Sequence, residues 1–120
     1  LVMSRIKPLG LTTGQPKVLD FLQDHDGAMQ KDIAKGCHIE PSSLSTILGG
    51  MERAGLLERS TRDENRRTVY VRLTDLGREQ CRRLNAIFAA AEEEALRGFS
   101  PQEMQQVQTL LERIYRNLND

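Results

Sequence analysis

The sequence contains no tryptophan, and aromatic residues make up only 4% of its 120 residues, so any core must be mainly aliphatic. Its two cysteines, Cys37 and Cys81, are too few for a disulfide framework and are typical of a reducing compartment. No apolar run approaches the length of a membrane-spanning helix, and the chain opens without a secretory signal. We therefore predict a cytoplasmic protein with no membrane contact. Because the chain begins with Leu1 rather than methionine, we also expect further residues before it.

Residues that carry catalysis or bind metals are also scarce. The two histidines, His25 and His38, do not have the spacing of a metal-binding motif such as His-x-x-x-His. The sequence has neither a glycine-rich phosphate loop nor a nucleophile elbow. We therefore predict that the protein is not an enzyme and that it holds no metal and no cofactor.

The net charge is zero, but the charges are unevenly distributed along the chain. Residues 53–83 carry nine arginines and five acidic residues, a local charge of +4. Residues 1–52 carry five basic and six acidic groups, and residues 84–120 carry three basic and six acidic groups. A basic segment in a neutral chain is typical of a face that binds a polyanion. A solvated arginine-rich surface is the alternative.

The apolar periodicity predicts a mainly helical chain with one small β-hairpin. Helices are expected over 12–24, 29–36, 41–54, 75–97 and 101–118, with the end of an earlier helix over 1–9. Strands near 56–59 and over 69–73 flank a loop without apolar residues. Two segments, Thr12 to Gln15 and Ser100 to Glu103, have the spacing of a capping box, which begins a helix.

The helix expected over 41–54 has two different faces. One carries an apolar stripe, and the other carries small or hydrogen-bonding residues and one arginine: Ser42, Ser43, Ser45, Thr46, Gly49 and Arg53. Adjacent glycines, Gly49 and Gly50, each cost a helix roughly 1 kcal/mol relative to alanine. That cost indicates that something approaches the helix backbone closely, either a ligand or another helix.

Three short helices followed by a hairpin form a winged helix-turn-helix, in which the third helix enters the major groove of DNA. The charged hairpin loop is then the wing. We predict that Arg62 and Arg66 neutralise phosphates, that Arg67 enters the minor groove, and that Asn65 belongs to the same contact. A winged helix that binds another protein remains the alternative, although residues 60–67 lack the apolar anchors of such a wing.

The two long helices after the wing have wider apolar stripes than one domain needs, which indicates dimerisation. We divide the chain into residues 1–10, the end of an N-terminal dimerisation helix, residues 11–73, the DNA-binding domain, and residues 74–120, the C-terminal dimerisation helices. The residues predicted to form the dimer surface are Leu84, Ile87, Met104, Val107, Leu111, Ile114 and Leu118.

Three segments resemble the MarR family of bacterial transcriptional regulators: LTTGQPKVL, IEPSSLSTILGGMERAGLLER and NRRTVYVRLTDLG. The resemblance implies a homodimer with interleaved terminal helices that binds a pseudo-palindromic operator on double-stranded DNA. It implies a repressor that a small phenolic or aromatic effector releases, bound between the winged lobe and the dimerising helices. Three positions depart from the family pattern, one in the wing and two in the recognition helix. Asn65 replaces the acid that orients the last wing arginine, and Thr46 and Gly50 replace basic residues of the recognition helix.

A thiol-based redox regulator is a further alternative. Cys81 has Arg78 and Arg82 nearby in sequence, which lowers the pKa of a thiol if the guanidinium groups face it. Cys37 lies at a helix junction, where a buried and unreactive thiol is the alternative. Redox sensors that resemble this sequence mostly carry the reactive cysteine in the first helix, and residues 1–36 contain none.

Overall fold

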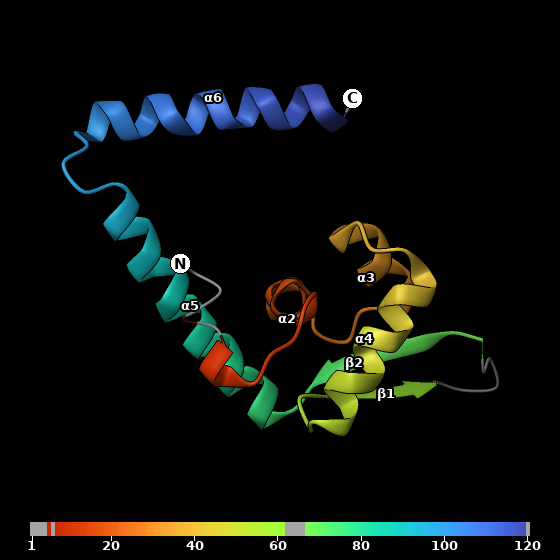
Figure 1. The fold of residues 1–120 in the computed structure, drawn as a ribbon. Helices are drawn as coiled ribbons and strands as arrows, with labels where there is room; N and C mark the ends of the chain where they lie inside the picture. The colour runs from red at the N-terminus through yellow and green to blue at the C-terminus, as the bar shows by residue number, and fades with distance from the viewer. Residues whose placement is uncertain (1–4, 6, 62–66, 120) are drawn as a thin grey trace. The chain divides into compact units, whose positions relative to one another are not determined.

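A computed structural model describes residues 5, 7–61 and 67–119 of the chain. The elements, in order, are a 3-10 helix η1 (Lys7–Leu9), then α2 (Gln15–Asp24), α3 (Gln30–Cys37), α4 (Pro41–Arg53), β1 (Leu57–Thr61), β2 (Val69–Leu73), α5 (Asp75–Ala95) and α6 (Pro101–Asn119). They fall into two compact units, residues 1–87 and residues 88–120. The predicted mainly helical fold with one small hairpin is confirmed (Figure 1).

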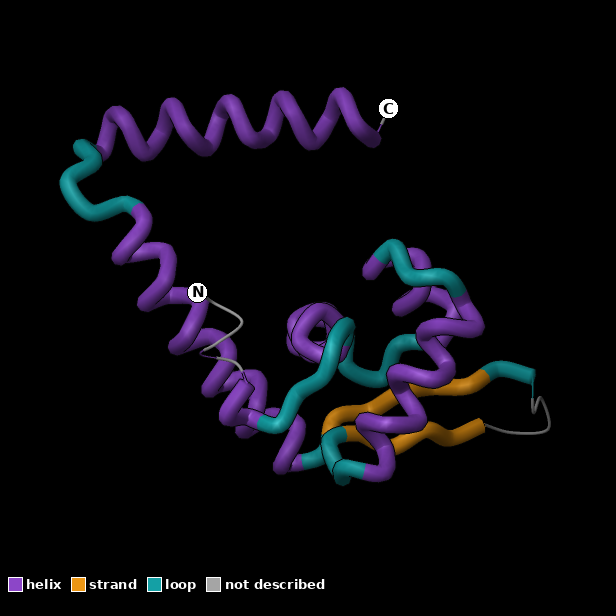
Figure 2. Tube along the Cα trace, in the orientation of Figure 1, coloured by secondary structure: helices purple, strands orange, loops and turns teal. Residues whose placement is uncertain are grey.

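The first unit surrounds an aliphatic core, as the scarcity of aromatic residues predicts. Helices α3 and α4 lie beside the hairpin, and α2 packs against both of these helices (Figure 2). Each element contributes apolar side chains at its own period, 3.6 residues in a helix and two in a strand. The fully buried side chains are Val18, Leu19, Leu22, Ile33, Cys37, Leu44, Leu48, Met51, Leu57, Val71 and Leu84.

The segment between α2 and α3 closes the outer edge of strand β2. The N–H of Val71 donates to the carbonyl oxygen of Ala28 at 2.9 Å, and the N–H of Gly27 donates to the carbonyl oxygen of Val71 at 2.8 Å. Two residues further along, the Leu73 N–H donates to Oδ1 of Asp26 at 2.8 Å. The two-stranded hairpin is therefore extended on one side by residues 26–28, which hold the wing against the helices.

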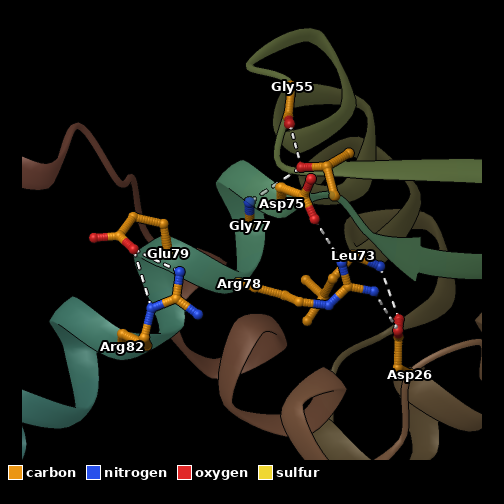
Figure 3. Close-up of polar contacts among 9 residues, drawn as sticks. Asp26, Gly55, Leu73, Asp75, Gly77, Arg78, Glu79 and Arg82 are labelled. Carbon is orange, nitrogen blue, oxygen red and sulfur yellow. Dashed lines mark hydrogen bonds and ion pairs between the residues drawn. The ribbon is translucent and has the colours of Figure 1, made fainter.

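Helix α5 begins at a polar junction that joins three parts of the first unit (Figure 3). The Thr74 hydroxyl donates to the Gly55 carbonyl oxygen at 2.6 Å and accepts the Gly77 N–H at 3.0 Å, so Thr74 is the predicted N-cap. In the next turn, the Arg78 guanidinium binds Oδ2 of Asp26 at 3.3 Å. The start of α5 is thus tied both to the turn after α4 and to the loop before α3.

The surroundings of Gly77 explain why a glycine ends the segment Leu-Thr-Asp-Leu-Gly, residues 73–77. A Cβ at this position would lie 2.0 Å from the carbonyl oxygen of Leu56, which is closer than atoms can approach. The same carbonyl oxygen accepts the N–H of Thr74 at 3.1 Å. Helix α5 therefore packs its backbone directly on the chain just before β1, and only glycine leaves room for that approach.

The N-terminal part of the first unit differs from the prediction. Helix α2 begins at Gln15, with Gly14 at φ 87° as its N-cap and no side-chain capping bond from Thr12. The Thr12 carbonyl instead accepts the Gln15 N–H at 3.1 Å and forms a turn before the helix, so only the glutamine half of the capping box is made. Most of the helix end predicted over residues 1–9 lies outside the described residues.

The second unit consists of the end of α5 and helix α6. Here the predicted capping box is confirmed, because the Ser100 N–H donates to Oε1 of Glu103 at 2.9 Å and the Glu103 N–H donates to the Ser100 hydroxyl at 3.1 Å. Large apolar side chains remain exposed in this unit: Phe88, Phe99, Met104, Leu110, Leu111, Ile114, Tyr115 and Leu118.

Candidate nucleic-acid interface

Most of the predicted polar face of α4 is exposed to solvent. Ser42, Ser43, Ser45, Thr46 and Arg53 are all exposed, while the apolar stripe of the same helix faces the core. Small side chains keep this face slim, as a helix in the major groove of DNA must be, because the groove is about 12 Å wide. Gly49 is the exception, since it is buried.

The N-terminus of α4 is already occupied by a carboxylate of the chain itself. Oε2 of Glu40 accepts the Ser43 N–H at 3.2 Å and hydrogen bonds from the Ser42 and Ser43 hydroxyls. The Ser42 hydroxyl, followed by the backbone N–H groups of Ser42 and Ser43, holds the pKa of the Glu40 carboxyl below its ordinary value. A free helix N-terminus attracts phosphate, but here Glu40 takes up those donors.

Gly49 lies beneath two arginine side chains. A Cβ built on it would be 3.4 Å from Nη1 of Arg53 and 3.6 Å from Nη2 of Arg59. The adjacent Gly50 instead faces α2, with its Cβ position 3.4 Å from Nε2 of Gln15. The two glycines thus serve different neighbours: Gly50 admits a packed helix, and Gly49 leaves room for two guanidinium groups.

Arg59, on strand β1, is bound by Glu52 of α4. Oε1 of Glu52 accepts Nε–H and Nη2–H of Arg59 at 3.3 and 3.2 Å, and Oε2 accepts the backbone N–H of Arg59 at 3.1 Å. The side chain of Arg59 is 25% exposed, and that of Glu52 is 40% exposed. Sequence reasoning did not select this pair, because nothing in the pattern shows that two residues on either side of the α4–β1 turn meet.

A cleft of about 820 Å³ lies between α3, α4 and the wing. Its lining includes Ser45 and Glu52 from α4, Lys31 from α3, Arg59 from β1 and the exposed wing residue Arg67. The cleft therefore brings together one predicted helix residue and one predicted wing residue. The other wing residues of the prediction, Arg62, Asn65 and Arg66, lie outside the described residues.

Both cysteines are buried thiols. The Cys37 thiol points to the carbonyl oxygen of Lys17 at 3.8 Å, and the Cys81 thiol to that of Leu19 at 3.6 Å. Burial raises the pKa of both thiols. This contradicts the expectation that neighbouring arginines lower the pKa of Cys81, since desolvation outweighs the charge of Arg82. In the part of the chain that the structure describes, no group of acidic, cysteine and histidine residues is arranged to hold a metal ion.

The residues predicted to form a dimer surface lie in two different environments. Leu84 is buried in the core of its own chain, and Ile87 packs against that core. Val107 is partly buried, whereas Met104, Leu111, Ile114 and Leu118 are exposed along α6. Of these seven residues, therefore, only those in the second unit contribute exposed apolar surface.

Comparison with known proteins agrees with this geometry. The MarR family model matches residues 11–69, which hold α2, α3, α4 and the first strand of the wing. The solved structure of transcriptional regulator PA3341 is 30% identical, covers 98% of this chain and 87% of its own, and has a TM-score of 0.81. The chain belongs to the MarR family of transcriptional regulators.

A curated relative and a further solved structure are also similar to most of this chain. The HTH-type transcriptional repressor Rv2887 of Mycobacterium tuberculosis is 26% identical over 113 residues, which are 94% of this chain and 81% of the relative. FabT of Streptococcus pneumoniae, solved in complex with DNA, has the same fold, with a TM-score of 0.84 at 23% identity over 100% of this chain and 87% of its own. The family consists of transcriptional regulators rather than enzymes. None of the described helices has the length and apolar character needed to cross a membrane.

Proposed function

We propose that the protein is a sequence-specific regulator of transcription that binds double-stranded DNA through α4 and the wing. The observation that carries the proposal is the shared cleft, in which Ser45 of the slim α4 face and Arg67 of the wing line the same surface. A helix in the major groove and a wing on the adjacent backbone require this arrangement. Arg53 and the exposed hydroxyls of α4 extend the same face.

The wing arginines are proposed to have two roles. Arg62 and Arg66 neutralise phosphates, which gives affinity that is independent of sequence and declines with salt. Arg67 enters the minor groove, where narrow A·T-rich segments attract guanidinium groups. Asn65 does not carry the negative charge that would orient Arg67. If Arg67 needs such a charge to be oriented, Asn65→Asp should tighten specific binding.

The test begins with capture and sequencing of genomic fragments that bind the purified protein, followed by affinity measurements on a selected fragment and on a random duplex. Arg67→Ala should weaken binding to the selected fragment by about 1–3 kcal/mol and relax preference at the outer flanks of the site. Arg62→Ala should weaken both duplexes equally and lower the salt slope by about one for each bound protomer. If Arg67→Ala changes neither affinity nor site preference, the wing does not read DNA.

We further propose that the protein is a homodimer that binds a pseudo-palindromic operator, with α6 and residues 1–10 in the dimer interface. Exposed Leu111, Ile114 and Leu118 on α6 support this, because a monomer rarely exposes so continuous an apolar surface. Sedimentation should give about twice the chain mass of 13.6 kDa. A monomer that still binds DNA with full affinity would contradict the dimer.

Repression, cytoplasmic location and release by a small aromatic effector complete the proposal. Repression is supported by the 26% identical mycobacterial repressor, and cytoplasmic location follows if the target is the chromosome. An effector is proposed from family membership, and a thermal-shift screen of phenols and aromatic carboxylates tests it. If no compound in the screen raises the melting temperature, release by such an effector is not part of the function.

A further inference from the structure

The two guanidinium groups above Gly49 do not belong to one salt bridge. Arg59 is neutralised by Glu52, with Nη2 of Arg59 at 3.2 Å from Oε1 of the carboxylate. Arg53 is exposed, and its guanidinium group has no hydrogen bond or ion pair with another side chain among the described residues. Yet both arginines reach the same point, because a Cβ on Gly49 would lie within 3.6 Å of a terminal nitrogen of each. The cluster of two arginines and one glutamate carries a net charge of +1.

The two guanidinium groups carry the same charge and repel each other, so their approach to one point needs a physical cause. On the Arg59 side the cause is visible, since Glu52 binds both the guanidinium and the backbone N–H of Arg59 and thereby fixes its direction. Three quarters of that side chain is covered, which keeps it in one conformation. On the Arg53 side, the residue stands one helical turn after Gly49 on the proposed DNA-binding face, so its side chain extends back over the glycine.

We propose that Arg53 and Arg59 form a single binding site for one phosphate of the DNA backbone, with Glu52 as the residue that positions Arg59. A phosphodiester has two unesterified oxygens, and each can accept hydrogen bonds from one guanidinium. Because Gly49 has no side chain, the two guanidinium groups can both reach one point above the helix backbone. This inference rests on the proposed DNA-binding function and assigns a second phosphate contact, on α4 and β1, in addition to the wing loop.

The test is a double-mutant cycle of Arg53→Ala and Arg59→Ala, read through the salt dependence of binding to a random-sequence duplex. Each neutralised phosphate contributes about 0.9 to the slope of log K against log salt. If the two arginines share one phosphate, the double variant should lower the slope by about one for each bound protomer, and its affinity should fall little further than that of either single variant. A fall of about two for each bound protomer, or no fall at all, overturns the shared site.

Two controls separate this result from a general loss of charge. Arg82→Ala with Arg83→Ala removes the same number of arginines from α5, where both pair with Glu79. That variant should keep the wild-type slope. If the wild-type protein itself fails to bind any duplex, the proposed DNA-binding function fails. If it binds and only the cycle gives independent losses, the shared phosphate site alone fails.

Substitutions at Gly49 and Glu52, which leave both arginines in place, test the geometry. Gly49→Leu fills the space between the arginines and should weaken binding about tenfold, whereas Gly49→Ala, whose Cβ has ordinary contacts, should bind like wild type. Glu52→Gln removes a negative charge, which by electrostatics alone should tighten binding to DNA. If Glu52 positions Arg59, this variant should instead bind several-fold more weakly, and only while Arg59 is present. Tighter binding by Glu52→Gln, or unchanged binding by Gly49→Leu, would overturn the proposal.

Discussion

Among the described residues up to Ile87, most apolar side chains point into one core, with Leu76 an exposed exception, whereas between residues 88 and 118 most of them remain on the surface. Both regions have the helical periodicity of apolar residues, so the pattern alone does not separate them. The difference is in what covers each stripe. In the first unit each helix stripe meets another element of the same chain, and in the second unit α6 presents Leu111 and Ile114 without a partner. The apolar surface of the first unit is therefore mostly buried within the chain itself, whereas part of the apolar surface of the second unit remains exposed to solvent.

The largest contrast should come from the same substitution in each region. Leu48→Ala should lower the free energy of unfolding by about 2–5 kcal/mol, because Leu48 is fully buried. Leu111→Ala removes the same atoms from a side chain that is 59% exposed, and should change the free energy of unfolding of the monomer by less than about 0.5 kcal/mol. Urea denaturation at low protein concentration measures both. Equal losses would show that Leu111 is covered by its own chain.

Glycines provide a second contrast. Gly77→Ala should destabilise the first unit by about 3 kcal/mol, since the new Cβ meets the backbone of Leu56 and helix α5 must shift. Gly98, between α5 and α6, has φ of 84° and no atom within 4 Å of its Cβ position, so Gly98→Ala should cost only about 1 kcal/mol of backbone strain. Thermal unfolding of the two variants ranks them. A smaller loss for Gly77→Ala than for Gly98→Ala would contradict the close approach.

The two helix caps should differ more modestly. Thr74→Ala removes both the cap on Gly77 and the hydrogen bond to Gly55, and should cost about 1–2 kcal/mol of unfolding free energy. Ser100→Ala removes one exposed capping bond and should cost about 0.5–1 kcal/mol. Thr74→Ser is the control that keeps the hydroxyl and should retain most of the stability. If it unfolds as easily as Thr74→Ala, the hydroxyl is not the stabilising group.

The smallest effect is expected from the capping carboxylates, Glu40 in the first unit and Glu103 in the second. Hydrogen bonds from Ser42 hold the pKa of Glu40 below its ordinary value, and those from Ser100 do the same for Glu103. A lowered pKa stabilises the fold above the ordinary value, and the stabilisation is lost as pH falls through the lowered one. The advantage of wild type over Glu40→Gln and Glu103→Gln should therefore disappear on acidification. Circular dichroism with pH measures it, and an advantage that persists in acid would contradict the assignment.

The sequence was sufficient for the order of the elements, because helices and strands leave periodic patterns and their caps have recognisable spacings. It predicted the hydrogen-bonded Ser100 box and the strand over 69–73, on which Val71 and Leu73 are buried and Arg72 is exposed. It also predicted the polar face of α4, because that face consists of neighbours on one helix.

The features that sequence reasoning missed all depend on contacts between elements. Glu52 reaches Arg59 only after the chain turns at Gly55, and Leu84 was assigned to a dimer surface because its periodic position does not reveal which element covers it. The thiol of Cys81 was expected to be activated because the arginines are close in sequence, yet burial decides its pKa. Residues 26–28 carry no strand pattern, and their pairing with β2 follows from tertiary packing.

That pairing has a consequence for the behaviour of the protein at high concentration. An open strand edge is a template on which another chain can add a strand and start aggregation. Here residues 26–28 already bind Val71 and Leu73 on the outer edge of β2, and Glu52 binds the N–H of Arg59 on the opposite edge. At these positions the hairpin has no unused donor to offer a neighbour. We therefore expect this part of the hairpin to stay free of edge-to-edge aggregation, so that copies of the chain associate through the apolar face of α6 instead.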